Sequence, residues 1–168
     1  SKASDALNRA KKPLNGSRVL LLGVAYKPDV DDTRESPALD VLQLLEEKGA
    51  EVVYHDPHVP EFELDGRHYE SRGLSDAELE RADLAVITTD HREVDYRQVV
   101  EHAPIVIDTR NALEGVDVEE GRATVYPISG PPREPSRGPE ADEGEDAPEA
   151  PPEPSYARRG GSGGTRSS

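Results

Sequence analysis

Between residues 17 and 128 the sequence alternates short apolar runs with amphipathic helical patterns, and this alternation constrains the fold more than any other feature. Short apolar runs bounded by turn residues are typical of buried strands, whereas apolar residues spaced three and four apart indicate helices. Strands that alternate with helices form a parallel sheet whose crossover helices cover both faces. The sequence therefore predicts an α/β domain with a doubly wound, Rossmann-like and mainly parallel sheet.

Local signals place the individual elements along the chain. Ser36 and Pro37 suit the N-cap and the first position of a helix that ends at Gly49. Ser75 and Glu78 form a capping-box pattern that opens another short helix. The predicted strands are residues 18–23, 51–55, 84–88, 105–107 and 123–126, with a possible edge strand at 67–70, and the predicted helices are residues 36–49, 75–81 and 95–102.

The loop after the first predicted strand carries the strongest functional signal. Residues 23–38 read GVAYKPDVDDTRESPA and place two cations, Lys27 and Arg34, before a helix N-terminus. A second segment, 108–110, follows a later strand and ends with Arg110. Ligands of open α/β sheets bind beyond the carboxyl ends of the strands, so both segments should lie on one edge. An ammonium and a forked guanidinium there favour a diphosphate or carboxylate ligand.

These motifs together resemble a known family. Residues 23–37 follow the pattern G-x-(A/S)-(F/Y)-K-(P/x)-x-x-x-D-x-R-E-S-P, which is the loop of the C-terminal domain in the UDP-glucose/GDP-mannose dehydrogenase family. The resemblance covers about residues 15–128 and is closest to UDP-N-acetylmannosamine and UDP-glucose 6-dehydrogenases. Further matching motifs, in the family's order and spacing, are YHDP at 54–57, AD at 82–83, TTDH at 88–91 and IDTRN at 107–111.

The resemblance implies roles for individual residues. In the family, the aromatic and lysine of the loop and the arginine of the D-x-R-N segment contact the UDP-sugar, which assigns Tyr26, Lys27 and Arg110 to substrate. The arginine of D-x-R-E-S-P contacts NAD, which is bound mainly by the N-terminal domain, and this assigns Arg34 to the cofactor. The implied chemistry is NAD-dependent oxidation of a UDP-hexose to a UDP-hexuronate, in two hydride transfers through a thiohemiacetal and a thioester on a catalytic cysteine.

The chain itself has no cysteine and no G-x-G-x-x-G dinucleotide fingerprint, so we expect it to be inactive alone and assign it no catalytic residue. We interpret it as a nucleotide-sugar-binding domain that works with N-terminal and central dehydrogenase domains, in cis or in trans, and forms homo-oligomers only in the full enzyme. Residues 1–16 are expected to be a connector from an upstream domain, and the absent initiator methionine favours a fragment. The alternative is a free-standing nucleotide-sugar binding or regulatory module whose tail recruits a partner.

Several other residues carry weaker signals. Asp56 lies where a dinucleotide site has its ribose-binding acid, but without the glycine fingerprint a turn with Pro57 is the better interpretation. His91, at the end of a strand, is expected to be a rim residue that orients a loop rather than one that transfers protons. The acids of the loop have no matching histidine ligands, so no metal site is predicted, and one of them can instead brace Arg34. These loop acids are Asp29, Asp31, Asp32 and Glu35, of which Asp32 is the one placed to brace the arginine.

Composition limits the classes of partner. The formal net charge is −15 and the sequence pI is about 4.7, which opposes binding to nucleic acid or to an anionic membrane surface. No apolar run is long enough to span a bilayer, so the expected compartment is the cytoplasm. Residues 129–168 are rich in Pro, Gly, Glu, Arg and Ser and have no apolar period. The composition therefore predicts a disordered tail at 129–168, whereas the family resemblance implies a UDP-sugar-binding domain at 17–128.

Overall fold

The computed structural model describes residues 2–9, 12–29 and 31–136, so the disorder expected for 137–168 lies outside the described residues. A five-stranded sheet has the order β2-β1-β5-β6-β7, and every neighbouring pair of its strands is parallel. Because the chain winds from the interior strand β1 first to one side and then to the other, the predicted doubly wound α/β fold is confirmed. The strands are β1 (Arg18–Leu22), β2 (Glu51–His55), β5 (Leu84–Ile87), β6 (Ile105–Asp108) and β7 (Thr124–Tyr126).

The helices begin where the sequence places N-caps. Side-chain oxygens of Ser36, Ser75 and Asp95 each accept a backbone N–H of the first turn, at 3.1 to 3.2 Å. These bonds satisfy donors that a helix leaves without partners, which is why the three helices start at these residues. None of the described helices is long and apolar enough to cross a membrane. The helices are α1 (Lys2–Arg9), α2 (Pro37–Glu47), α3 (Asp76–Arg81) and α4 (Tyr96–His102).

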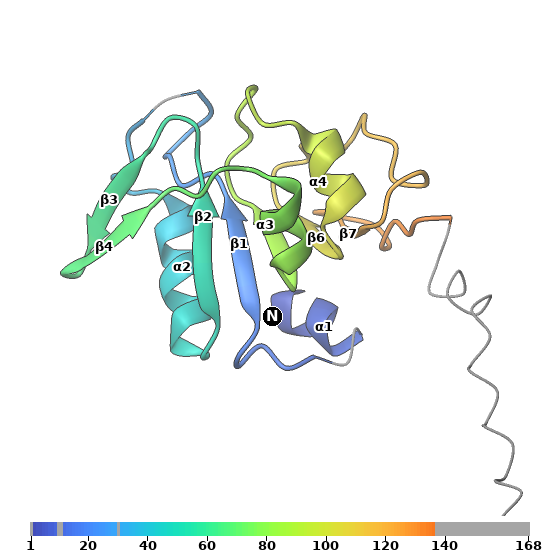
Figure 1. Ribbon diagram of the computed structural model, residues 1–168, viewed down its shortest axis with the longest axis horizontal. Coiled ribbons are helices and arrows are strands. Elements are labelled where there is room, and N and C mark those ends of the chain that lie inside the picture. The colour runs from blue at the N-terminus through green and yellow to red at the C-terminus, as the bar shows by residue number, and fades with distance from the viewer. Residues whose placement is uncertain (1, 10–11, 30, 137–168) are drawn as a thin grey trace, which may run out of the picture. The chain divides into compact units, whose positions relative to one another are not determined.

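Helices cover both faces of the sheet (Figure 1). Successive side chains of β1 point to opposite faces. Val19 and Leu21 pack in the cluster that contains α1 and α2, whereas Leu20 and Leu22 pack in the cluster that contains α3 and α4. A strand that is covered on both faces has no polar side to display, which explains why β1 reads as an apolar run without alternation.

A separate antiparallel hairpin extends from the domain beside α2 (Figure 1). Its strands are β3 (Glu61–Leu64) and β4 (Arg67–Glu70), and Phe62 stacks on Tyr69 with ring centroids 5.0 Å apart. The predicted strand at 67–70 is therefore confirmed, but its place at the edge of the main sheet is wrong, apart from one isolated bridge between the next residue and β2. The sequence did not indicate β3, because only one of its side chains is buried.

Segments at both ends of the described chain pack onto the sheet. Ala6 and Leu7 of α1 are fully buried in the core. Arg133 and Val125 exchange two backbone hydrogen bonds, of 2.7 and 2.8 Å, so residues 129–136 run back along β7. The composition wrongly assigned these eight residues to the disordered tail, because backbone pairing of this kind needs no apolar pattern.

One contact at the amino-terminal edge of the sheet gives a pH dependence. Burial raises the pKa of Asp83, but hydrogen bonds from Lys12 Nζ (2.6 Å) and the backbone N–H of Arg18 (2.9 Å) outweigh it and hold this pKa below its ordinary value of 3.8. Because the folded-state pKa is the lower one, the contact stabilises the protein above the unfolded-state pKa, and this stabilisation is lost as the pH falls through the folded-state pKa. Lys12→Met should therefore lower the free energy of unfolding near neutral pH by at most about 1 kcal/mol.

Urea denaturation of wild type and Lys12→Met measures this effect. The difference between the two proteins should shrink as the pH falls below 3.8 and through the lower folded-state pKa of Asp83, because the ion pair is lost once this carboxylate is protonated. An equal difference at neutral and acid pH would show that the ion pair does not cause it.

Candidate functional site

The loops that follow β1, β5 and β6 meet at the carboxyl-terminal edge of the sheet. Strand order reverses between β1 and β5, because β2 lies on one side of β1 and the later strands lie on the other. Open α/β sheets bind ligands at such a point. Tyr26, Lys27 and Arg34 lie on the loop after β1, and Arg110 lies on the loop after β6. The fold therefore brings all the predicted site residues to one edge.

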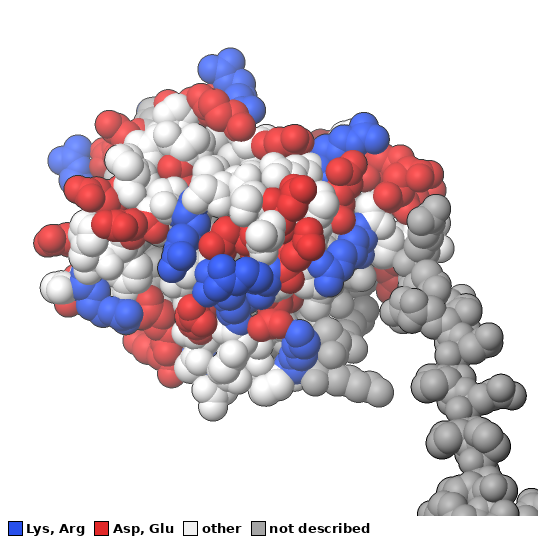
Figure 2. All heavy atoms as spheres, viewed as in Figure 1, with Lys and Arg blue, Asp and Glu red and all other residues white. Residues whose placement is uncertain are grey.

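Tyr26 and Lys27 form the exposed start of the loop after β1. The residues before them are buried, whereas Tyr26 is 49% exposed and Lys27 is also exposed. Neither side chain has a hydrogen-bond or ion-pair partner among the described residues. Elsewhere, acidic and basic side chains are interspersed on the surface (Figure 2). An ammonium without a carboxylate partner, on a chain of net charge −15, is available to bind an anion.

Arg110 is held by contacts that leave the end of its guanidinium unoccupied. Asp108, which is 2% exposed, accepts the backbone N–H groups of Arg110 (3.0 Å), Ala112 (3.0 Å) and Leu113 (2.8 Å) and so fixes the turn after β6. The Arg110 Nε donates to the carbonyl of Thr88 (3.0 Å) at the end of β5. The two terminal nitrogens bond to no described residue, so the fork can bind an anion through two parallel hydrogen bonds.

Arg34 is braced by Asp32 on the same loop. Asp32 accepts from the Nε and Nη2 of Arg34, both at 3.1 Å, and from its backbone N–H at 2.9 Å. The bond to the Asp32 side chain raises the pKa of Arg34, and the same bond lowers the pKa of Asp32. The Arg34 side chain is nevertheless 88% exposed, so the brace orients a guanidinium that faces solvent.

A hollow of about 440 Å³ adjoins the turn that carries Arg110. Asn111 and Glu114 of that turn form one wall, and the segment after β7 forms the other, with Pro127, Ser129 and Pro132. The prolines are apolar, whereas Asn111 and Ser129 offer hydrogen-bonding groups. Arg110 itself is not among the residues that line this hollow.

The carboxylate of Asp56 occupies the backbone donors that follow β1. Its Oδ2 accepts the N–H groups of Val24 (2.8 Å) and Ala25 (3.1 Å), and its Oδ1 accepts the N–H of His58 (2.8 Å). In dinucleotide-binding sheets, the backbone after the first strand faces the pyrophosphate. Here a buried carboxylate of the chain itself takes that place. Asp56 therefore belongs to a turn, as predicted, and these residues do not fit a dinucleotide pyrophosphate.

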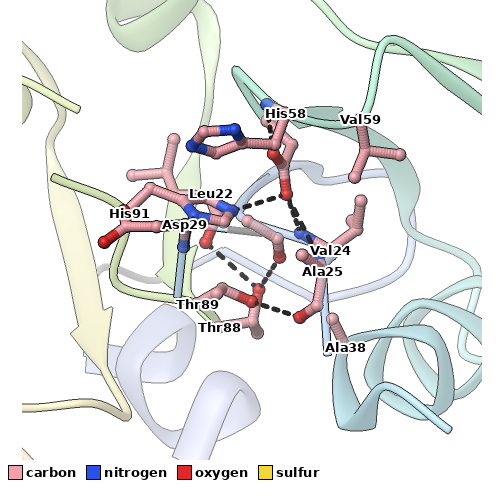
Figure 3. A network of polar contacts seen from close by, with 12 residues as sticks. Leu22, Val24, Ala25, Asp29, Ala38, His58, Val59, Thr88, Thr89 and His91 are labelled. Carbon is pink, nitrogen blue, oxygen red and sulfur yellow. Dashed lines mark hydrogen bonds and ion pairs between the residues drawn. The ribbon is translucent and has the colours of Figure 1, made fainter. Parts of the chain in front are cut away.

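His91 lies under the same loop with both ring nitrogens bonded (Figure 3). Its Nδ1 is 2.8 Å from the backbone nitrogen of Asp29, and its Nε2 is 2.9 Å from Asp56 Oδ2. The expected contact with the loop is confirmed. The ring is fully buried, however, and therefore does not lie exposed at the rim.

The loops after β1 and β5 cross at close range (Figure 3). Thr88 Oγ1 donates to the carbonyl of Gly23, and Thr89 Oγ1 donates to the carbonyl of Ala25 at 2.8 Å. Gly23 has φ of 91°, and a Cβ on it would lie 2.5 Å from the Thr89 Cβ. Only glycine fits this crossing, which sets the direction in which the loop leaves β1.

The fold also gathers Asp29, His58 and His91, which are far apart in the sequence. One potential ligand atom of each lies within 4.8 Å of the others. The His91 Nδ1 already accepts the Asp29 N–H, and the Asp29 carboxylate pairs with the Nε of Arg92 at 2.9 Å. These bonds would have to break before the group could bind a metal. The hairpin brings together a second, fully exposed group, Glu61, His68 and Glu70.

The sequence indicated Asp56 only as a turn residue and gave Asp108 no role, although both accept several backbone N–H groups at this edge. Asp56 directly follows β2 and Asp108 ends β6, and each accepts N–H groups of the turn that comes next or of a neighbouring loop. An aspartate at the end of a buried strand is a recognisable signal for such a turn. The partners across the sheet, such as Val24, have no signal in the sequence.

Together these features define an α/β domain with exposed cations on two loops at the carboxyl-terminal edge of its sheet and with the Asp56 carboxylate on the backbone donors after β1. Residues 20–115 match the UDP-glucose/GDP-mannose dehydrogenase family, UDP binding domain. The chain belongs to this family.

Individual relatives give the same result. UDP-glucose 6-dehydrogenase TuaD of Bacillus subtilis is 33% identical over 129 residues, which are 73% of this chain and 27% of TuaD. UDP-N-acetyl-D-mannosamine dehydrogenase of Methanococcus vannielii is 36% identical over 104 residues, which are 57% of this chain and 23% of the relative. The chain therefore spans about a quarter of the length of these curated relatives.

Solved structures of dehydrogenases share the fold. The NDP-N-acetyl-D-galactosaminuronic acid dehydrogenase of Methanosarcina mazei superposes with a TM-score of 0.60 and 27% identity, over 75% of this chain and 27% of that one. The UDP-D-ManNAc dehydrogenase of Pyrococcus horikoshii gives a TM-score of 0.58 and 29% identity, over 74% of this chain and 28% of that one. Both similarities involve only part of the larger chains.

Proposed function

We propose that this chain binds the UDP-sugar substrate of an NAD-dependent UDP-sugar 6-dehydrogenase, which oxidises a UDP-hexose to a UDP-hexuronate. The observation that carries the proposal is the pair of cations, Lys27 and Arg110, at the carboxyl-terminal edge of the sheet. Their outer nitrogens have no partner among the described residues. Membership of a UDP binding family supports the nucleotide, and the names of the relatives support the class of sugar.

The spacing of the strands suits a diphosphate. β5 separates β1 from β6, so the two loops begin about 10 Å apart at a strand spacing of about 4.8 Å. The ammonium of Lys27 acts as a flexible point charge, whereas the guanidinium of Arg110 binds phosphate oxygens in a fixed orientation. Tyr26 adds an exposed ring and hydroxyl beside Lys27. The ligand would thus be neutralised and oriented by the same groups.

Other domains, joined in cis or in trans, would supply the rest of the enzyme. The backbone donors after β1 are taken by Asp56, so NAD would be held mainly elsewhere, with the exposed guanidinium of Arg34 reaching it from this domain. The chain has no cysteine and so cannot supply the covalent nucleophile that the family resemblance implies. In this proposal the chain binds and orients substrate and is inactive by itself.

Removing either cation should weaken binding of UDP. Lys27→Ala removes one charge-assisted contact, worth about 1.5 to 3 kcal/mol, which corresponds to an affinity about 10- to 150-fold lower. Arg110→Lys keeps the charge but loses the fork, and should also weaken binding. Isothermal titration of each variant with UDP and UDP-glucose measures both effects.

Two exposed cations outside the loops that follow β1 and β6 provide matched controls. Lys48 follows α2 at the opposite edge of the sheet, and Arg97 lies on α4 and pairs with Glu101. Lys48→Ala and Arg97→Lys repeat the same chemical changes and should leave the affinity for UDP unchanged. Equal losses in the controls, or full affinity in both Lys27→Ala and Arg110→Lys, would overturn the assignment of the site.

A further inference from the structure

A buried pair, Asp56 and His91, connects the ends of β2 and β5 to the loop that carries Tyr26 and Lys27. The Asp56 Oδ2 accepts the N–H groups of the residues just before Tyr26 and also contacts the His91 Nε2 at 2.9 Å. The other nitrogen of His91 contacts the backbone of Asp29, two residues after Lys27. One carboxylate therefore anchors the loop directly on one side of Tyr26 and Lys27, and through an imidazole on the other side.

The hydrogen bonds determine which nitrogen of His91 carries the proton. A backbone N–H can only donate, so the Nδ1 that faces Asp29 must be the acceptor. The Nε2 then carries the proton and donates it to Asp56. Both side chains are fully buried, and both ring nitrogens are used. His91 therefore has no free atom for a ligand and can act on one only through the loop.

The loop needs such an anchor because its backbone is strained. Asp29 has φ of 60° and Glu35 has φ of 59°, and a residue other than glycine is disfavoured in this left-handed region. The Asp29 carboxylate adds bonds to the backbone N–H of Arg92 (3.1 Å) and to its Nε (2.9 Å). The Arg92 side chain is 86% exposed, so this second contact is open to solvent and the bond to buried His91 is the stronger restraint.

We propose that Asp56 and His91 form a latch that fixes the backbone on both sides of Tyr26 and Lys27 and so presents the Lys27 ammonium to the anionic ligand. They are positioning residues. The expected effect of the latch on ligand affinity rests on the proposed function. The latch itself is present in the chain without ligand.

Two substitutions of His91 separate the two bonds. The amide nitrogen of His91→Gln reaches the position of Nε2 and can still donate to Asp56, but no acceptor remains for the Asp29 N–H. The amide oxygen of His91→Asn reaches the position of Nδ1 and can accept from Asp29, but the donor to Asp56 is lost. His58→Gln is the matched control, because it removes an imidazole whose centroid lies 4.8 Å from that of His91 and which bonds to Glu93 rather than to any described residue of the loop.

Amide hydrogen exchange, urea denaturation and UDP titration are measured on the full chain for each variant. In His91→Gln, exchange of the Asp29 amide should accelerate about tenfold and affinity for UDP should fall, with global stability largely kept. In His91→Asn, the Asp29 amide should stay protected from exchange and the affinity for UDP should be kept, while the free energy of unfolding falls. His58→Gln should change neither the exchange nor the affinity.

Unchanged exchange at Asp29 in His91→Gln would overturn the latch, as would affinities that follow global stability alone across the variants. A wild-type ¹⁵N spectrum with the proton on Nδ1 of His91 would also overturn it. The exchange and the spectrum need no ligand. If wild type failed to bind UDP, the proposed function would therefore fail separately, and the exchange data would still decide the latch.

Discussion

Gly23→Ala is expected to lower the free energy of unfolding by about 3 kcal/mol or more. Gly23 has φ of 91°, where an L side chain is disfavoured by about 1 to 2 kcal/mol. The added Cβ would also lie 2.5 Å from the Cβ and 2.7 Å from the carbonyl oxygen of Thr89. Most of these neighbouring atoms are backbone or at the root of a side chain, so they can move only if the crossing of the two loops opens.

Gly66→Ala is the control for Gly23→Ala. Gly66 has φ of 78°, but a Cβ there would meet no atom within 4 Å. The cost should be limited to the backbone conformation, about 1 kcal/mol. Urea denaturation of both variants isolates the cost of the clash with Thr89. Equal destabilisation would show that the close crossing contributes nothing to stability.

Asp56→Ala is the second change with a large expected effect, about 3 to 5 kcal/mol of lost stability. The substitution leaves the N–H groups of Val24, Ala25 and His58, together with the His91 Nε2, without their acceptor in a buried region. Each buried donor that loses its partner costs about 1 to 3 kcal/mol, reduced where the loop can relax to reach water. Asp56→Asn should destabilise less, because it retains one acceptor oxygen.

Glu63→Gln on the hairpin is the control for the Asp56 variants, because it also removes one negative charge but at an exposed position. It should change the free energy of unfolding by no more than about 0.5 kcal/mol. Thermal or urea denaturation compares the variants. A small effect of Asp56→Ala, similar to that of Glu63→Gln, would contradict the role of Asp56 as the anchor of the loop after β1.

Most of the fold could be predicted because its signals are local. Ser36, Ser75 and Asp95 cap helices at the places where the sequence has its capping patterns, and the buried strands read as apolar runs. The hairpin strand at 61–64 and the ordered segment 129–136 could not be predicted. Both segments are held by backbone pairing and by a few side-chain contacts with residues that are distant in the sequence. Neither kind of contact leaves a periodic pattern in the sequence.

The candidate site was only partly predictable. The common edge of Lys27, Arg34 and Arg110 could be predicted because a parallel topology places the ends of β1 and β6 on one edge. The buried partners of the loop depend on contacts between residues more than 30 positions apart, such as His91 with Asp56. No spacing rule indicates such a contact, so Asp56 was interpreted only as a turn residue.

Isothermal titration of the full chain with UDP, UDP-glucose and UDP-N-acetylmannosamine, with NAD in parallel, tests the central claim most directly. The account predicts saturable binding of the UDP ligands that Lys27→Ala weakens, and no saturable binding of NAD, because Asp56 already occupies the backbone donors after β1. Comparison of the two sugars would also show which is preferred. NAD binding as tight as UDP binding, or no binding of any UDP ligand, would contradict the claim that this chain itself holds the nucleotide sugar.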